Sequence, residues 1–169
     1  MSAIKFATAG IIGLFVLAAG LSYYGYQNTV YPIDRALGNL ARAASAQTPY
    51  DLAEYIRAAK ADLPKSGNPV WAFPTARTDF GLIQLELDRI LSRTNSIASL
   101  EPNSSAYNTG MSDIHVTLVA MQKDIVDAIP YMYVSTTNMA ISAVWIAIIL
   151  GLFAFMRRGK SRFSEFESQ

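Results

Sequence analysis

The sequence predicts an all-α protein in which two transmembrane helices flank an extracytoplasmic antiparallel bundle of about four helices. Only 16% of the residues are charged, whereas roughly a quarter is usual in a soluble domain. Two long stretches, residues 6–33 and 128–156, contain no charged residue. Between them, apolar residues recur at the spacing of amphipathic helices. The expected boundaries are residues 1–26 for the first span, 27–135 for the outer domain, 136–156 for the second span and 157–169 for a short cytoplasmic tail.

The first uncharged stretch contains "FATAGIIGLFVLAAGLSYYGY", from Phe6 to Tyr26. A helix rises about 1.5 Å per residue, so this segment is long enough to cross a hydrocarbon core of about 30 Å. The most apolar part of the second stretch runs from Met139 to Met156. Tyrosines end the first segment and precede the second, at positions where aromatic rings favour the headgroup region of a bilayer. Both segments are therefore expected to contact lipid.

A secretory signal peptide is the alternative for the first segment. Lys5 would be its charged start, and Ala18–Gly20 would supply small residues for cleavage. The apolar run continues beyond this site to Tyr24, which makes it longer than the core of a typical signal peptide. The length therefore favours an uncleaved anchor.

Basic residues beside each span predict its orientation, because positive charge is enriched on the cytoplasmic side. Lys5 precedes the first span, and "RRGKSR", residues 157–162, follows the second. We therefore expect a two-pass protein of the cell membrane with both termini in the cytoplasm. Its outer domain holds nine Lys and Arg against eleven Asp and Glu, so the basic patch that nucleic-acid binding requires is missing.

The first three helices of the outer domain have recognisable starts. Pro32 suits the first turn of a helix, where its missing N–H is not needed. Pro49 has the same position in the second helix, with Thr48 as N-cap, and Pro64 ends that helix. The third helix begins near Thr78. The apolar faces predicted for them are Ile33, Leu37, Leu40, Ala41 and Ala44 in the first; Leu52, Ile56, Ala59 and Leu63 in the second; and Phe80, Ile83, Leu87, Ile90 and Leu91 in the third.

The fourth helix begins between Ser104 and Ser112 and is expected to continue through Pro130, with a kink, into the second span. Its apolar residues alternate in steps of three and four, a heptad-like seam. They are Met111, Ile114, Leu118, Met121 and Ile125.

The only histidine, His115, lies near Ser112 and Asp113. On a helix these side chains point in divergent directions, so they do not form the relay of a catalytic triad. His115 alone is a weak candidate metal ligand, since imidazole suits zinc or copper. The residues 103–105 match the N-glycosylation sequon at Asn103, a short match that is common by chance. We therefore expect no catalytic activity, cofactor or resident metal in this chain by itself.

The connector "GNPVWAFPTARTDFG", residues 67–81, differs from the rest of the chain. Its two prolines disfavour helix at the residues before them, and Trp71 and Phe73 fall on one side of an extended chain. Two interpretations remain open. The rings fold back onto this protein's own bundle, as large aromatics usually do. Alternatively, with Arg77 and Asp79 they bind a partner, because Trp, Tyr and Arg dominate interface hot spots.

Small residues in the predicted spans suggest helix contacts inside the membrane, since they let two helices approach closely. Ordinary membrane-helix glycines are an equally good explanation. The spans contain no acid or base, which argues against an ion pathway through them. The residues expected in helix packing are Ala9, Gly10, Gly13, Gly20 and Gly151.

The stretch "NPVWAFPTARTDFGLIQ", residues 68–84, lies between two membrane anchors and ahead of a helix pair. It resembles small two-span proteins of ammonia-oxidising archaea, which are additional subunits of the archaeal ammonia monooxygenase, a copper membrane enzyme. The resemblance implies a non-catalytic accessory subunit whose partners are larger integral-membrane subunits. Copper would be held by those larger subunits. No catalytic residue is implied for this chain.

A membrane-tethered sensor is the second hypothesis, because chemoreceptor ectodomains also place a four-helix bundle between two spans. The residues after Met156 are too few for a signalling domain, so a sensor would signal through a partner chain. An enzyme would require a metal held by His115 together with residues of a partner. We therefore favour a non-catalytic subunit that covers the outer face of larger membrane proteins.

Overall fold

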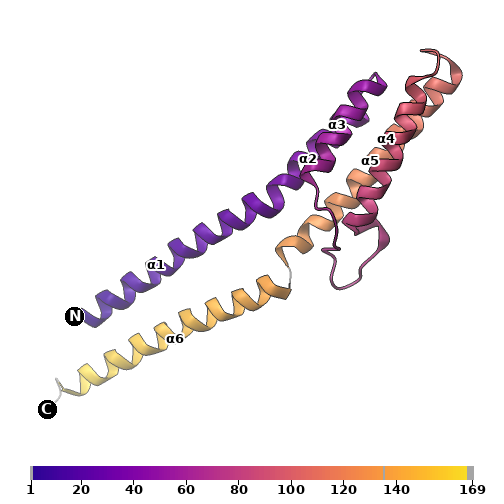
Figure 1. Cartoon of the computed structure of the whole chain (residues 1–169). Helices are drawn as coiled ribbons and strands as arrows, with labels where there is room; N and C mark the ends of the chain where they lie inside the picture. Colours follow the sequence, from indigo (N-terminus) through magenta and orange to yellow (C-terminus); the bar gives the residue numbers. More distant parts are fainter. Residues whose placement is uncertain (1, 135, 167–169) are drawn as a thin grey trace. The chain divides into compact units, whose positions relative to one another are not determined.

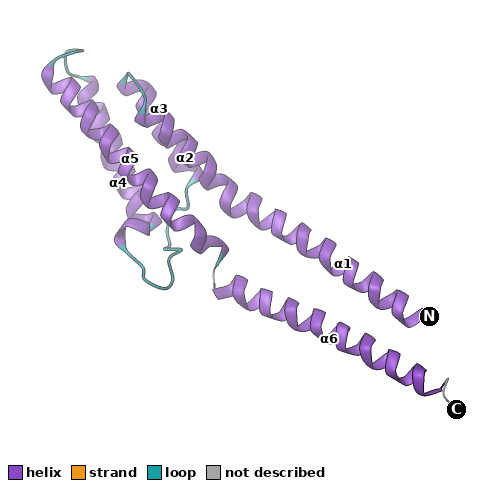
Figure 2. Ribbon diagram, turned by 180° about the vertical axis from the view of Figure 1, so that it is seen from behind, coloured by secondary structure: helices purple, strands orange, loops and turns teal. Residues whose placement is uncertain are grey.

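The computed structural model describes residues 2–134 and 136–166, and in this part the chain is helical without any strand (Figure 2). The predicted all-α class is therefore confirmed. The chain divides into two compact units. The first, here named the helix pair, contains α1 (Ser2–Gly25) and α6 (Thr136–Phe166). The second, Tyr26–Tyr133, is named the bundle.

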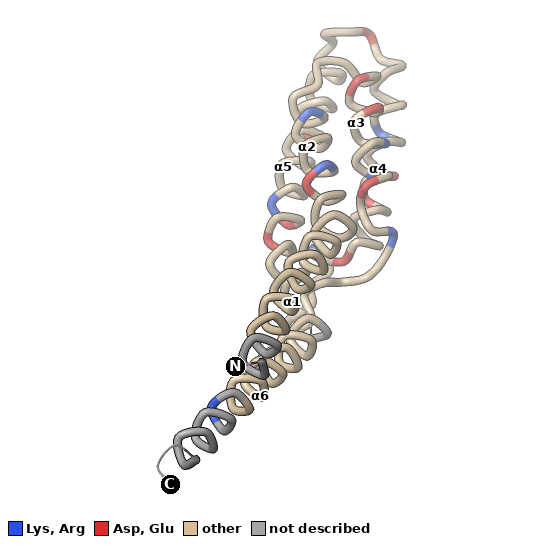
Figure 3. The backbone as a smooth tube through the Cα atoms, turned by 90° about the vertical axis from the view of Figure 1, so that its left-hand side faces the viewer, with Lys and Arg blue, Asp and Glu red and all other residues tan. Residues whose placement is uncertain are grey.

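The helix pair consists of two long apolar helices that contact one another. The start of α1 and the end of α6 lie at the same end of the pair (Figure 1). Two segments, Thr8–Ala44 from α1 into α2 and Ser105–Phe155 across α5 and α6, each contain a window long and apolar enough to cross a membrane, and no residue of either window is buried. Figure 3 shows charged residues along the bundle but very few along the described parts of α1 and α6.

The bundle contains α2 (Tyr31–Ala44), α3 (Pro49–Asp62), α4 (Phe80–Ala98) and α5 (Ser105–Tyr133). Consecutive helices run in opposite directions (Figures 1 and 2). Each helix contacts the next, and α2 also contacts α5, so the four close into a ring around one core. This is the up-down-up-down topology of a four-helix bundle.

The core is made by the predicted faces of α3, α4 and α5. Every residue predicted for α3 and α5 is buried, and in α4 only Leu91 is half-buried rather than buried. The predicted N-cap Thr48 is confirmed, since its side chain accepts a hydrogen bond from the backbone N–H of Asp51 (3.1 Å). Sequence periodicity therefore identified most of this core.

The predicted face of α2 is partly wrong. Ile33 and Leu40 are buried as expected, but Ala36 and Ala43 complete the core while Ala41 is exposed. Alanines lie on several sides of this helix, so their spacing could not indicate which flank packs against neighbours α3 and α5.

No loop separates α1 from α2. The helix passes through η1 (Tyr26–Val30), a π-helical turn, directly into α2. Pro32 lies in the first turn of α2, as predicted. A proline inside a continuous helix clashes with the carbonyl four residues earlier, and the wider π-helical turn lies where that clash would occur.

The predicted continuation of the fourth helix into the second span is wrong. The helix α5 does pass through Pro130, but it ends at Tyr133, and α6 begins separately at Thr136. The lost N–H of Pro130 weakens the last turn, and the following residues Val134 and Thr136 are β-branched and poor helix formers. At its other end, α6 extends through the predicted tail to Phe166.

Candidate functional site

The loop that joins α3 to α4, residues 63–79, is named the aromatic loop. Connections in helix bundles usually have about 2–8 residues, so this one is unusually long. It lies at the end of the bundle where α2 begins and α5 ends (Figures 1 and 2). Loops of this length are usually either functional or disordered linkers, so its internal contacts decide between the two.

The aromatic loop is held by a defined set of hydrogen bonds. Gly67 has a φ of +101°, and its carbonyl accepts a bond from the N–H of Phe80 (2.9 Å), which closes the loop. Asn68 lies at the centre, because its Nδ2 donates to the carbonyl of Thr75 (2.8 Å). Its Oδ1 accepts from the N–H of Val70 and from Oγ1 of Thr78, both at 3.0 Å. The loop therefore has a defined conformation.

The two aromatic rings of the loop are exposed to different extents. Val70 is buried, whereas Trp71 is 48% and Phe73 82% exposed. The high exposure of Phe73 does not fit the interpretation that this ring covers the bundle's own core, whereas for the half-covered Trp71 both interpretations stay open. The buried positions at this end belong to other residues, namely Leu63, Val70, Thr78 and Phe80.

The two charged residues predicted to join the rings have other surroundings. Asp79 is the N-cap of α4, where its Oδ1 accepts from the N–H groups of Gly81 (2.8 Å) and Leu82 (3.1 Å). Such a cap stabilises a helix by about 1 kcal/mol. Arg77 lies in η2 (Ala76–Thr78) and lines a cleft described next. Asp79 thus has a structural role as a helix cap, and partner binding by Trp71, Phe73, Arg77 and Asp79 stays a prediction.

An open cleft of about 420 Å³ lies between η2, α4 and α5. Its floor is mostly apolar, with Leu82, Ile83 and Met121 among its lining residues. Arg77 and Asp124 lie at its charged rim. Its size falls within the range of about 300–1,000 Å³ that small-molecule sites occupy.

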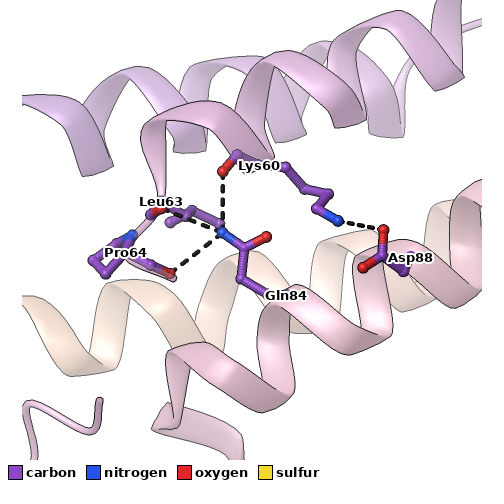
Figure 4. A network of polar contacts seen from close by, with 5 residues as sticks. All are labelled: Lys60, Leu63, Pro64, Gln84 and Asp88. Atoms are coloured by element: carbon purple, nitrogen blue, oxygen red, sulfur yellow. Dashed lines mark hydrogen bonds and ion pairs between the residues drawn. The ribbon is translucent and has the colours of Figure 1, made fainter. Parts of the chain in front are cut away.

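A side-chain amide connects α3 and α4, the two helices that the aromatic loop joins. Nε2 of Gln84 on α4 lies within hydrogen-bonding distance of the carbonyls of Lys60 (3.0 Å), Leu63 (3.2 Å) and Pro64 (3.3 Å), at the end of α3 (Figure 4). The last carbonyls of a helix have no partner within it, so Gln84 supplies one from outside. Lys60 also forms an ion pair with Asp88.

An exposed apolar row along α5 was not identified from the sequence. Val116, Val119 and Val126 are each half exposed or more, and Lys123 lies between them in the row. The hydrogen bond from Nζ of Lys123 to Asp127 (2.9 Å) raises the pKa of Lys123 above its ordinary value. The sequence does contain a pattern that indicates this row, because the three valines repeat in steps of three and seven residues. The buried heptad seam on the opposite side of α5 obscured it.

Two polar side chains of α5 are partly buried outside the aromatic loop. Nε2 of His115 and Nε2 of Gln122, seven residues later on α5, are buried without a hydrogen-bond partner in the described part of the chain. His115 lines a small cleft with Tyr107 and Ser112. Among the residues that the structure describes, no three His, Asp or Glu side chains are grouped to hold a metal ion. Asn103 is exposed in a turn, at a φ of 65°.

The small residues of the spans are exposed. A side chain added at Gly10, Gly13, Gly20 or Gly151 would meet no atom within 4 Å, and Ala9 is exposed as well. These positions therefore have open space beside them in the single chain. Close packing of another helix there stays a prediction.

No protein-family model, no curated protein and no solved structure matches this chain.

Proposed function

We propose that this chain is a non-catalytic accessory subunit of a larger integral-membrane complex. In this proposal α1 and α6 anchor it in a cell membrane with both termini in the cytoplasm. The bundle then lies outside and docks onto the outer part of a larger subunit. The observation that carries the proposal is the exposed valine row of α5, on a bundle whose chain continues at both ends into apolar helices.

Exposed apolar side chains support the membrane part of the proposal. Phe15, Val16 and Leu17 of α1 are all more than half exposed, as are Leu150, Phe153 and Phe155 of α6. A protein surrounded by water rarely exposes contiguous apolar surface on this scale. In a bilayer the same surface is favourable, and the backbone polar groups are satisfied within the helices.

The composition of the α5 surface supports a protein partner. The valine row is interrupted by the charged pair of Lys123 and Asp127, which would be costly to place in hydrocarbon. Apolar residues mixed with charge at the edge are typical of protein–protein interfaces. A partner held in the same membrane needs little additional affinity, because tethering raises its effective concentration.

The resemblance of residues 68–84 supplies a candidate complex, the archaeal ammonia monooxygenase. The copper of that enzyme would then belong to its larger subunits. The same four-helix architecture is also compatible with other multi-subunit membrane enzymes, so the proposal does not depend on that identification.

Native electrophoresis of mildly solubilised membranes tests the proposal. We expect the chain to migrate with larger integral-membrane proteins, identified by mass spectrometry of the band. Val119→Glu together with Val126→Glu should release it from that band, because two charges then enter the interface. The matched control is Asn95→Glu, an exposed position on α4, which should leave the band unchanged. Migration alone with the unmutated chain would contradict the proposal.

A membrane-tethered sensor that signals through a partner chain is the second candidate, and the cleft between η2, α4 and α5 is the observation that favours it. A ligand in this cleft would contact α4 and α5 together. Arg77→Ala would then weaken ligand binding without changing the migration of the complex. A chain that migrates alone or as a small homo-oligomer would favour this candidate.

A further inference from the structure

The two ends of the bundle differ in the chemistry of their connections. The connections 45–48 and 99–104 contain no aromatic ring and no basic residue, and the second carries an acid, Glu101. The aromatic loop, residues 63–79, differs from both: it includes Trp71 and Phe73 and two basic residues, and its one acid, Asp79, is the N-cap of α4. Both basic side chains, Lys65 and Arg77, are exposed.

The chain itself enters and leaves the bundle at the end that carries the aromatic loop. Tyr26 follows directly after α1, and only two residues separate the end of α5 at Tyr133 from the start of α6. If α1 and α6 span a bilayer, this end of the bundle is therefore tied close to the headgroup region. Tyr31 and Tyr133, at the same end, are also exposed.

We propose that the aromatic loop is a membrane-interface anchor, with Trp71 and Phe73 inserted among the lipid headgroups and upper acyl chains. Aromatic rings favour this region of a bilayer. Lys65 and Arg77 would lie beside anionic headgroups, which attract basic residues near the surface. The inference rests on the proposed membrane anchoring by α1 and α6, and it gives the two rings a lipid rather than a protein partner.

The hydrogen bonds of the loop explain why it can act in this way. The bonds made by Asn68 and the closure between Gly67 and Phe80 order the loop before it meets lipid. An ordered loop loses little conformational freedom on insertion, which favours binding. Val70, between these bonds and the rings, is buried in the bundle and fixes the direction of the loop tip.

The chain has two tryptophans, which makes the test simple. Trp145→Phe leaves Trp71 as the reporter of the loop, and Trp71→Phe leaves Trp145 on α6 as the reporter of the span. Each full-length variant is reconstituted into vesicles of phosphatidylcholine with a minority of phosphatidylglycerol. The phosphatidylcholine carries bromine either near the top or near the end of its acyl chains, and bromine quenches tryptophan at its own depth.

The matched control places a reporter at the opposite end of the bundle. Tyr50 is 74% exposed in the first turn of α3, so Tyr50→Trp in a chain that lacks the other two tryptophans reports that end. We expect shallow bromine to lower the emission of Trp71 about twofold, as for a ring about 5–10 Å deep in the interface. The reporter at position 50 should not respond.

Failure of the loop inference is distinguishable from failure of membrane anchoring. If Trp145 is quenched and Trp71 is not, the loop inference is wrong while the anchoring stands. If neither is quenched, both are wrong. Equal quenching at positions 71 and 50 would mean that the whole bundle lies on the surface, which also contradicts a loop-specific anchor. A Trp71 shielded from aqueous quencher only in the native complex would assign the loop to a protein partner.

A charge at the loop tip gives an independent check. Phe73→Asp, in the chain that keeps only Trp71, should abolish the shallow quenching, because a carboxylate opposes insertion among anionic headgroups. Since Phe73 is the most exposed ring of the loop, the variant should keep the helical content of the parent chain by circular dichroism. Unchanged quenching in this variant would contradict the inference.

Discussion

At the scale of single residues, backbone conformation and polar contacts decide the shape of the aromatic loop. Gly67 adopts a φ that side chains disfavour, and Asn68 satisfies three partners at once. Asp79 begins α4 at the end of the loop. The exposed position of the two rings follows from these contacts rather than from any property of the rings themselves.

Gly67→Ala should lower the free energy of unfolding of the bundle by about 1 kcal/mol, because a Cβ at positive φ is strained. There is open space beside this glycine, so the cost is conformational and not steric. Gly38→Ala in α2 is the matched control, since it also has open space but should stabilise the helix by about 0.5–1 kcal/mol. Urea unfolding of the full chain in mild detergent, followed by circular dichroism, measures both. Equal effects of the two substitutions would contradict this account of Gly67.

Gln84→Leu should destabilise the bundle by about 1 kcal/mol, because carbonyls at the end of α3 lose a donor. The neighbouring ion pair offers a comparison on the same two helices. Lys60→Gln removes the pair with Asp88, whose carboxylate is exposed while the lysine is half-buried, and should cost less, since ion pairs at a protein surface contribute about 0–1 kcal/mol. The same unfolding measurement separates them. A larger loss for Lys60→Gln would show that the ion pair, not the amide, connects α3 to α4.

At the scale of elements, the sequence was sufficient where one face of a helix was clearly apolar. The seam of α5 and the faces of α3 and α4 agree with their periodicity. The side of α2 that packs into the core was not predictable, because its alanines lie on more than one side of the helix. The break between α5 and α6 was missed because hydropathy continues across it, whereas helix continuity depends on Pro130 and the β-branched residues after it.

The candidate site was predictable only in part. The unusual residues of the connector indicated a functional loop, but large aromatics are so often buried that their exposure could not be read from the sequence. The valine row of α5 was hidden because valine is acceptable in both core and surface. Which of two apolar faces of a helix is covered depends on the neighbouring helices, and these are not visible in local spacing.

Adjacent residues of α5 should respond in opposite ways to truncation. Leu118 is fully buried, so Leu118→Ala should cost about 2–5 kcal/mol through lost burial and a cavity. Val119→Ala, on the exposed row, should change stability by no more than about 0.5 kcal/mol. Urea unfolding tests the pair. A comparable loss for both would mean that the valine row is packed inside this chain and is not a docking surface.

At the scale of the whole molecule, two chemically different units share one chain. The helix pair exposes apolar side chains along its length, whereas the bundle buries one apolar face of each helix and carries ion pairs between neighbouring helices, such as Arg35 with Asp62 and Arg93 with Asp113. This division is what a protein with one part in lipid and the other in water requires. The docking surface and the loop anchor both depend on it.

Accessibility of single cysteines to a membrane-impermeant maleimide tests this central claim most directly, because the natural chain has no cysteine and gives no background. In intact cells we expect Thr109→Cys, exposed on α5, to be labelled. Ser2→Cys and Ser161→Cys should be labelled only after the membrane is permeabilised, since both termini are predicted to be cytoplasmic. Labelling of all three positions in intact cells would contradict the account. Recovery of the chain in the fraction without membranes would contradict it as well.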